Sequence, residues 1–198
     1  MSQLTEIDID PRILHGLKDL GFNSFFPIQE KAIPPLMAGR DVIGQSHTGS
    51  GKTAAFGIPL ISKVDPNNTE IQGLVLAPTR ELAVQITKDL NSYAKYTDIR
   101  ALAVYGGESI ERQFSMLREN PRIIVATPGR LLDHLERRSI RLADVSFIVL
   151  DEADRMLDMG FIEDIERILS NVPEGRQVAL FSATIPREIQ QLAEMYMH

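Results

Sequence analysis

Six short apolar runs, rich in Leu and β-branched residues, are separated by longer segments along the chain. They are Asp41–Gly44, Gly73–Ala77, Ala101–Val104, Ile123–Ala126, Phe147–Leu150 and Val178–Phe181. Nearly continuous apolar runs of this length are typical of parallel strands that are covered on both faces. The alternation of strand and helix along the chain therefore predicts an α/β fold, with a mostly parallel sheet and right-handed crossovers.

The segments between and before these runs carry helical periodicity. The expected helices include Arg12–Leu20, Ile28–Met37, Arg80–Tyr93 and Phe161–Leu169. Gly21 is a normal stop for the first of them, and Pro27 suits the first turn of the second. Pro34 and Pro35 are expected to disturb the far end of that second helix, because proline lacks the backbone N–H.

Composition narrows the class of protein. The 198 residues fit a single domain, and 43% hydrophobic with 24% charged residues is the balance of an ordinary globular protein. The chain has no Cys, which excludes disulfides, thiolate metal sites and thiol nucleophiles. No membrane span or secretory signal is visible, so we expect a cytoplasmic protein. The net charge of −6 gives no support to a nucleic-acid partner. If nucleic acid binds, the contacts must come from backbone amides and a few arginine side chains.

A phosphate-binding loop follows the first predicted strand. Its members are Ser46, His47, Thr48, Gly49, Ser50, Gly51, Lys52 and Thr53. The glycines allow successive N–H groups to point at an anion, and the helix that begins here adds its positive end. Lys52 would reach the β- and γ-phosphates, and the Thr53 hydroxyl would ligate Mg²⁺. The strict pattern begins with Gly, where this chain has Ser46.

Two carboxylates follow the fifth predicted strand, in the sequence Asp151-Glu152-Ala153-Asp154. Ligands of such sheets bind at the carboxyl ends of the strands, so these acids are expected beside the phosphate loop. Asp151 fits the role of a Mg²⁺ ligand, and Glu152 can orient and deprotonate an attacking water. With Lys52, these two acids form the predicted catalytic set of a nucleotide hydrolase.

The remaining strand ends are rich in small residues, hydroxyls and Arg. They carry Pro78, Thr79 and Arg80; Gly106 and Gly107; Thr127, Pro128, Gly129 and Arg130; and Ser182, Ala183 and Thr184. Backbone N–H groups, Thr hydroxyls and Arg hold a phosphodiester backbone without reading bases. Each also has a plainer interpretation: Thr79 and Thr127 as helix caps, the two glycines as a turn, and Arg80 and Arg130 as surface ion pairs.

Taken together and in this order, the motifs resemble those of the DEAD-box RNA helicases. Asp151–Asp154 spells that family's namesake sequence, and the residues at 78–82, 127–130 and 182–184 stand where its motifs Ia, Ib and III stand. The resemblance runs from about Gly21 to the end of the chain. It implies the first RecA-like P-loop domain of an ATP-dependent RNA helicase, with helices on both faces of the sheet.

The resemblance also implies roles for individual residues. Phe22 would stack on adenine and Gln29 would read it, within a region at residues 1–40 that precedes the core of the single domain 1–198. Motifs Ia and Ib and the paired glycines would contact the RNA backbone. Ser182 and Thr184 would hydrogen-bond Asp154 and couple hydrolysis to strand separation. The implied cofactors are ATP and Mg²⁺.

The chain departs from the family pattern at a few places. Leu4 stands nearest to the place of an isolated upstream aromatic, Phe25-Phe26 replaces Pro-Thr, and Ser46-His47 replaces Ala-Gln. Motifs IV to VI, with their arginine finger, have no counterpart here. A second RecA-like domain is therefore expected in the parent protein, and this domain alone should be nearly inactive.

Two other functions stay open at the level of sequence. A P-loop GTPase or kinase is disfavoured by the lack of an Asn-Lys-x-Asp guanine reader and by the presence of Glu152. A non-enzymatic RNA-binding protein with a decayed site is disfavoured by the intact Lys52, Thr53, Asp151 and Glu152.

Overall fold

The parallel strands of the sheet bring the candidate motifs together at the carboxyl ends of the strands. In the computed structural model, which describes residues 3–198, six strands run in the order β1-β6-β5-β2-β4-β3, and every pairing is parallel. The strands are β1 (Val42–Gln45), β2 (Gly73–Leu76), β3 (Ala101–Val104), β4 (Ile123–Ala126), β5 (Phe147–Leu150) and β6 (Gln177–Ser182). The predicted α/β fold is confirmed.

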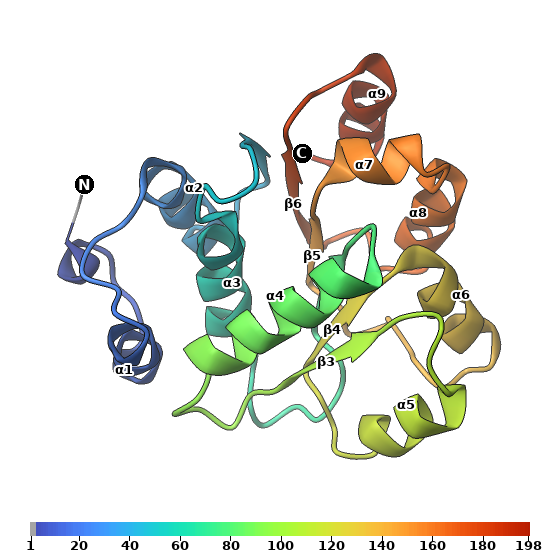
Figure 1. The fold of residues 1–198 in the computed structure, drawn as a ribbon, viewed down its shortest axis with the longest axis horizontal. Coiled ribbons are helices and arrows are strands. Elements are labelled where there is room, and N and C mark those ends of the chain that lie inside the picture. The colour runs from blue at the N-terminus through green and yellow to red at the C-terminus, as the bar shows by residue number, and fades with distance from the viewer. Residues whose placement is uncertain (1–2) are drawn as a thin grey trace.

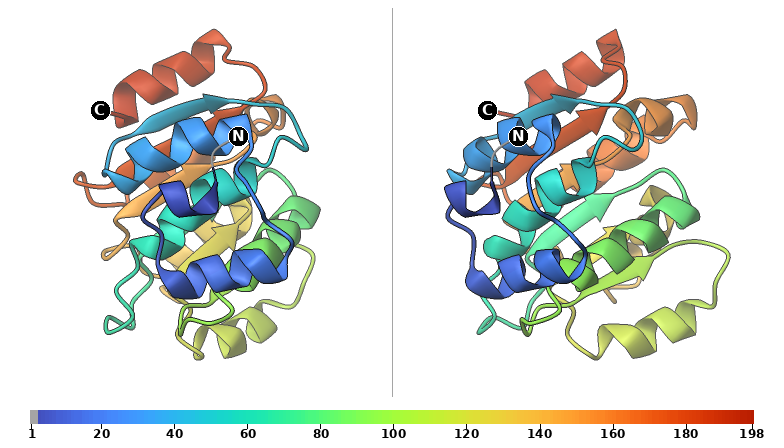
Figure 2. Two further views of the ribbon diagram at one scale, coloured as in Figure 1. Left: turned by 90° about the vertical axis from the view of Figure 1, so that its left-hand side faces the viewer. Right: turned by 60° about the vertical axis from the view of Figure 1, so that its left-hand side comes forward.

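Helices cover both faces of this sheet (Figure 1). They are α1 (Pro11–Asp19), α2 (Pro27–Met37), α3 (Lys52–Ser62), α4 (Arg80–Tyr93), α5 (Ile110–Leu117), α6 (Pro128–Glu136), α7 (Ala153–Asp158), α8 (Ile162–Leu169) and α9 (Arg187–Tyr196), after a short 3₁₀ turn at Leu4–Glu6. The sheet's edge strands are β1 and β3, and in Figure 2 β1 lies near α9 while β3 lies near α5.

Two apolar layers fill the space between the helices and the sheet. Alternate residues of one strand belong to different layers: Val75 packs with α1 to α4, while Leu74 and Leu76 pack with α6 to α9. All three are fully buried. The two-sided burial explains why β2, β4 and β5 read as unbroken apolar runs in the sequence.

The expected elements agree with the structure to within one residue at each end. The exception concerns the prolines of α2, since the helix continues through Pro34 and Pro35 to Met37. Their carbonyls still accept hydrogen bonds, from Ala38 N and Arg40 N, and the fixed φ of proline is itself helical. The two prolines therefore lie within the last turn without ending the helix, which ends at Met37 as expected, and the bond from Arg40 to Pro35 spans five residues instead of four.

A nucleotide-type site where β1, β5 and β6 end

The predicted phosphate loop leaves β1 and enters α3, as the sequence indicated. Gly51 is the N-cap of α3 and has a left-handed φ of 84°. A Cβ there would lie 2.7 Å from both Gln29 Nε2 and the Phe26 ring, so only glycine fits without displacing them. Lys52 and Thr53 are the first residues of α3, at the positive end of its dipole.

Lys52 is paired with the acids that follow β5. Its Nζ lies 3.0 Å from Asp151 Oδ1 and 3.7 Å from Glu152 Oε1. The side chains of Lys52 and Asp151 are 9% and 0% exposed. Burial raises the pKa of Asp151 to about 6, although Lys52 opposes the rise. The two motifs that lie a hundred residues apart in sequence thus form one charged cluster.

Several oxygen atoms of this cluster are buried and have no hydrogen-bond partner within the described residues. They are Ser46 Oγ, Ser50 Oγ, Asp151 Oδ2 and Glu152 Oε2, the last of which lies 3.6 Å from Arg155 Nη1 in an ion pair. Buried polar atoms are normally satisfied, so their gathering in one place points to a polar ligand. The set fits Mg²⁺ bound to a nucleotide, since this ion takes one or two protein oxygens and completes its shell with waters and phosphates.

No group of three or more metal-binding side chains occurs within residues 3–198.

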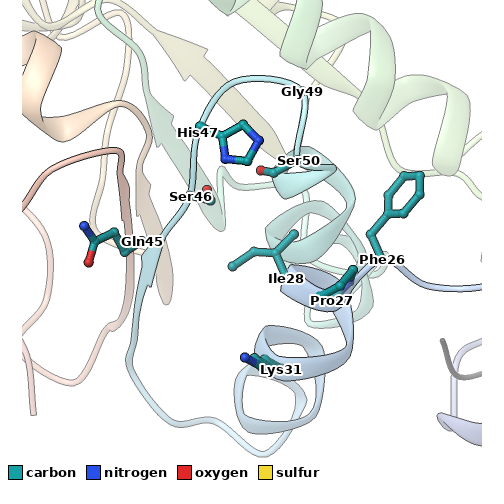
Figure 3. A pocket seen from close by; sticks show the side chains of 9 residues that line it. All are labelled: Phe26, Pro27, Ile28, Lys31, Gln45, Ser46, His47, Gly49 and Ser50. Carbon is teal, nitrogen blue, oxygen red and sulfur yellow. The ribbon is translucent and has the colours of Figure 1, made fainter.

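Two neighbouring hollows flank the loop. The larger, of about 430 Å³, is lined by Phe26, Pro27, Ile28, Lys31, Gln45, Ser46, His47, Gly49 and Ser50 (Figure 3). The smaller, of about 180 Å³, is lined by Ser46, Thr48, Lys52, Glu152, Asp154, Arg155 and Ala183. The first is mostly apolar and suits a flat base, while the second holds the charged groups that suit phosphates.

Phe22 and Gln29, which were expected to bind adenine, are not among the residues that line the larger hollow. Gln29 is 1% exposed, and its amide is engaged with the protein: Oε1 accepts from Phe26 N, and Nε2 donates to the Gly51 carbonyl, both at 2.9 Å. Phe22 does not line the pocket and packs edge-on against Tyr93. Phe26, 51% exposed, is the aromatic side chain at the pocket.

Asp154 connects the acids to the segment after β6. Its backbone N–H donates to Ser182 Oγ at 3.0 Å, and its Oδ2 accepts from the Thr184 hydroxyl at 2.9 Å. Burial tends to raise the pKa of Asp154, but hydrogen bonds from Thr184 and Ser182 lower it overall. These are the contacts that the resemblance implied for this segment.

Gln45 was missed at the level of sequence. It ends β1, and its Nε2 donates to the Ala183 carbonyl at 3.1 Å. In Figure 3 its side chain extends away from His47 and Ile28, so it ties the start of the phosphate loop to the segment after β6. Its place at a strand end, directly before the loop, was the available signal.

The remaining candidate residues gather at the ends of β2, β3 and β4. Thr79 caps α4 by accepting from Leu82 N at 3.3 Å, so the plainer interpretation of Thr79 is confirmed. Arg80 stacks on the Tyr105 ring at 4.9 Å and reaches the turn at Gly107, whose φ is 84°. Thr127 is the N-cap of α6 but makes no side-chain capping bond.

Arg130 is less available than its motif suggested. Its side chain is 15% exposed, and Nη1 donates to the Glu108 carbonyl at 3.0 Å and to Gln113 Oε1 at 3.2 Å. Its approach to Asp133 is a loose 3.9 Å. The expected ion pair of Arg130 is thus present, and a partly buried contact with the loop that carries Gly106 and Gly107 is added to it.

Comparison with known proteins agrees with this geometry. Residues 26–192 match the DEAD/DEAH box helicase family. An ATP-dependent RNA helicase CshA of Listeria monocytogenes is 50% identical over 198 residues, covering 100% of this chain and 38% of that protein. A DEAD-box ATP-dependent RNA helicase CshA of Bacillus licheniformis is 52% identical over 192 residues, covering 97% of this chain and 39% of that protein.

A crystal structure of a DEAD box protein from the hyperthermophile Methanococcus jannaschii superposes with a TM-score of 0.95 at 42% identity, covering 100% of this chain and 54% of that one. The chain belongs to the DEAD/DEAH box helicase family, and its sheet is the RecA-like sheet of that family. It spans well under half the length of the curated relatives it matches.

Proposed function

We propose that residues 1–198 form one domain, the ATP-binding N-terminal domain of a DEAD-box RNA helicase, with residues 1–40 as the adenine-binding region before the core. Met1 and Ser2 of that region lie outside the described residues. The observation that carries the proposal is the set of buried oxygens without a hydrogen-bond partner at Ser46, Ser50 and Asp151, where the loop after β1 meets the acids after β5. The phosphate oxygens of a nucleotide would accept from the two serine hydroxyls, and Mg²⁺ with its bound waters would satisfy the carboxylate oxygen.

The chain's own residues then divide the work. Backbone amides at the start of α3 and the Lys52 ammonium hold phosphate oxygens, and Thr53 and Asp151 hold the ion. When bound, the ion neutralises charge that develops on the phosphates. Glu152, with its carboxylate beside Lys52, takes the proton of the attacking water. The hydrogen bonds of Asp154 with Ser182 and Thr184 link a change at the nucleotide site to the end of β6 and the segment after it.

The adenine base of the nucleotide is held in the larger hollow. Gln29 stabilises the phosphate loop by donating a hydrogen bond to the Gly51 carbonyl. Phe26 supplies the aromatic surface that the resemblance had assigned to Phe22. The preference for adenine over guanine is supported by the names of the relatives, which are ATP-dependent helicases, rather than by a free amide of Gln29. RNA binds through its backbone at the edge formed by Arg80, Gly106, Gly107 and residues 127–130, with little dependence on sequence.

Hydrolysis and unwinding require a second RecA-like domain, which supplies charge stabilisation from the far side of the γ-phosphate. An arginine finger of this kind is worth about 10³–10⁵ in rate. The relatives named as RNA helicases are between two and three times as long as this chain, which supports a further domain in the parent protein. Within residues 3–198 no helix is long and apolar enough to cross a membrane, and we propose a cytoplasmic location.

Titration of the chain with Mg-ATP, with Mg-GTP and with ATP in the presence of EDTA tests the proposal. We expect weak binding that prefers ATP to GTP and that weakens when the metal is removed. Equal affinity for the two nucleotides would favour a different class of P-loop enzyme. No binding of either nucleotide at millimolar concentration would favour a decayed site.

A further inference from the structure

A buried polar network behind the proposed RNA-binding edge has no part in the nucleotide chemistry. Its centre is Gln113 of α5, whose neighbour is His134 of α6, and both side chains are 0% exposed. Fully buried polar side chains of this kind impose one arrangement on their neighbours, because any other leaves a polar atom unsatisfied.

The amide group of Gln113 joins three segments of the chain. Its Nε2 donates to the Tyr105 carbonyl at 2.9 Å and to Glu108 Oε2 at 3.3 Å. Its Oε1 accepts from His134 at 2.8 Å and from Arg130 at 3.2 Å. One side chain therefore connects the loop at residues 105–108 with the first and second turns of α6.

The polarity of this network is fixed. The Tyr105 carbonyl can only accept a hydrogen bond and the Arg130 guanidinium can only donate, so the amide of Gln113 has one allowed orientation. The Nε2 of His134 must then carry a proton, and in the neutral ring Nδ1 accepts from the Ser139 hydroxyl at 2.7 Å, which is closer to that hydroxyl than its other acceptor, the His134 carbonyl at 3.1 Å. Burial, together with the nearby Arg130, lowers the pKa of His134 to about 4, which keeps the ring neutral and the network intact.

The loop that this network holds is the one between two RNA-contact candidates. Arg80 lies over the Tyr105 ring on one side of it, and Arg130 donates to the Glu108 carbonyl on the other. Gly107 takes a left-handed φ of 84° at the turn itself. The direction of the loop's amide groups thus depends on what anchors residues 105 and 108.

We propose that Gln113, supported by His134, is a positioning residue for RNA: it holds the Gly106–Gly107 turn and Arg130 in one arrangement, so that both face the same stretch of phosphate backbone. The inference rests on the proposed RNA-binding function of this edge. It also gives Arg130 a share in holding the turn, in addition to any direct contact.

A second buried glutamine provides a matched control. Gln72, 7% exposed, also makes several hydrogen bonds, accepting from Asp65 N and donating to the Asp65 and Asn68 carbonyls. It lies directly before β2, at the opposite end of that strand from Arg80. Replacing either glutamine with leucine removes a comparable buried network from a different place.

The experiment compares Gln113→Leu and Gln72→Leu in the 198-residue chain. Binding of a fluorescent single-stranded decauridylate is measured at low salt, where backbone contacts are strongest. Mg-ATP affinity and the ¹⁵N order parameters of Gly106 and Gly107 are measured in parallel. For Gln113→Leu we expect RNA affinity to fall about tenfold, the value of one good hydrogen bond. Its glycine order parameters should fall from about 0.85 towards 0.6.

Gln72→Leu should lose thermal stability, leave the RNA affinity within twofold of the parent and leave the order parameters of Gly106 and Gly107 near 0.85. Neither variant should change ATP affinity. Gln113→Glu is the milder second variant, should the leucine variant fail to fold. It keeps an acceptor for His134 and Arg130 but loses the donor to the Tyr105 carbonyl, and we expect it to weaken RNA binding as well.

The outcomes separate the two proposals. If the parent chain binds RNA and the Gln113 variants bind it as tightly as Gln72→Leu does, the positioning role is overturned and the RNA-binding function stands. If the parent chain binds no RNA even at low salt, the proposed RNA-binding edge and the inference drawn from it both fail.

Discussion

The Lys52 ammonium lies 3.0 Å from Asp151 Oδ1, so the cation of the phosphate loop is already paired with the carboxylate that is proposed to hold the metal. Binding of a nucleotide with its ion has to break this ion pair, because the lysine would then bind phosphate oxygens and the carboxylate would bind the ion. The pair keeps two buried charges compensated until then, because separation of a buried pair without replacement partners is strongly unfavourable.

Lys52→Ala should reduce ATP affinity by at least about tenfold, since one ammonium that faces several phosphate charges is lost. Isothermal titration calorimetry of the 198-residue chain measures the change. Lys88→Ala is the control, because Lys88 is exposed on α4 and is not among the residues that line either hollow. Equal ATP binding by Lys52→Ala and the parent would contradict the assignment of the loop.

Glu152→Gln should still bind Mg-ATP and yet lose about 10²–10⁴ in hydrolysis rate, the usual effect of losing a general base. The amide keeps the shape of the side chain at this N-cap of α7 and removes the basic oxygen. The measurement is phosphate release by the chain joined to a second helicase domain. Glu163→Gln, at an exposed position of α8, is the control. Unchanged turnover in Glu152→Gln would show that another residue is the general base.

Gln29→Ala should lower stability by about 1–3 kcal/mol, because it removes two partly buried hydrogen bonds, to the Gly51 carbonyl and from the Phe26 amide. It should also weaken binding of ATP and GTP alike, since the phosphate loop that holds their common triphosphate loses its support from α2. A loss of the preference for ATP would in addition place Gln29 at the nucleotide base. Competition between the two nucleotides for a fluorescent analogue measures the preference.

Gln29→Glu separates the effect on the start of α2 from the effect on the phosphate loop. The carboxylate still accepts from Phe26 N but cannot donate to the Gly51 carbonyl, so the helix start is kept and the loop contact is lost. If Gln29→Ala leaves the preference for ATP unchanged, Gln29 has a structural role only.

His134 should make the folded state sensitive to acid. Its pKa is about 4 in the folded protein and about 6.5 when exposed to water, so the unfolded state takes up a proton at higher pH. Stability from this residue is therefore complete above pH 6.5 and falls as the pH drops towards 4, by at most about 1.4 kcal/mol per pH unit. Chemical denaturation between pH 7 and pH 4.5 should show a shallower slope for His134→Asn than for the parent.

His15→Asn is the matched control, because the His15 side chain is 60% exposed on α1. It should keep the slope of the parent. A slope that is identical in all three proteins would show that His134 does not keep its depressed pKa in solution.

The sheet and its motifs were predictable from sequence because burial on two faces leaves a plain signature. β3, β4 and β5 were predicted with their observed ends, and α4 was predicted from Arg80 to Tyr93. The order of motifs along such a sheet then brings strand ends together, which is why Lys52 and Asp151 could be expected at one place.

What the sequence did not show was the use of each side chain within the site. Gly21-Phe22 and Phe25-Phe26 offer several aromatic rings in a short segment, and only the path of the chain into α2 decides that Phe26 reaches the pocket while Phe22 packs on Tyr93. Gln113 and His134 carry no motif, since a polar network is specified by contacts between α5 and α6 rather than by spacing in either helix.

The account is tested most directly by phosphate release from the purified 198-residue chain, with and without single-stranded RNA. All the catalytic groups proposed here come from one domain, and the charge stabilisation expected from a second domain is worth about 10³–10⁵ in rate. ATP and RNA that bind across a cleft between two domains strengthen each other only when that cleft can close. We predict very slow hydrolysis that RNA does not change, and stimulation by RNA once a second helicase domain is joined to the chain. Robust RNA-stimulated turnover by the chain alone would contradict the division of the active site between two domains.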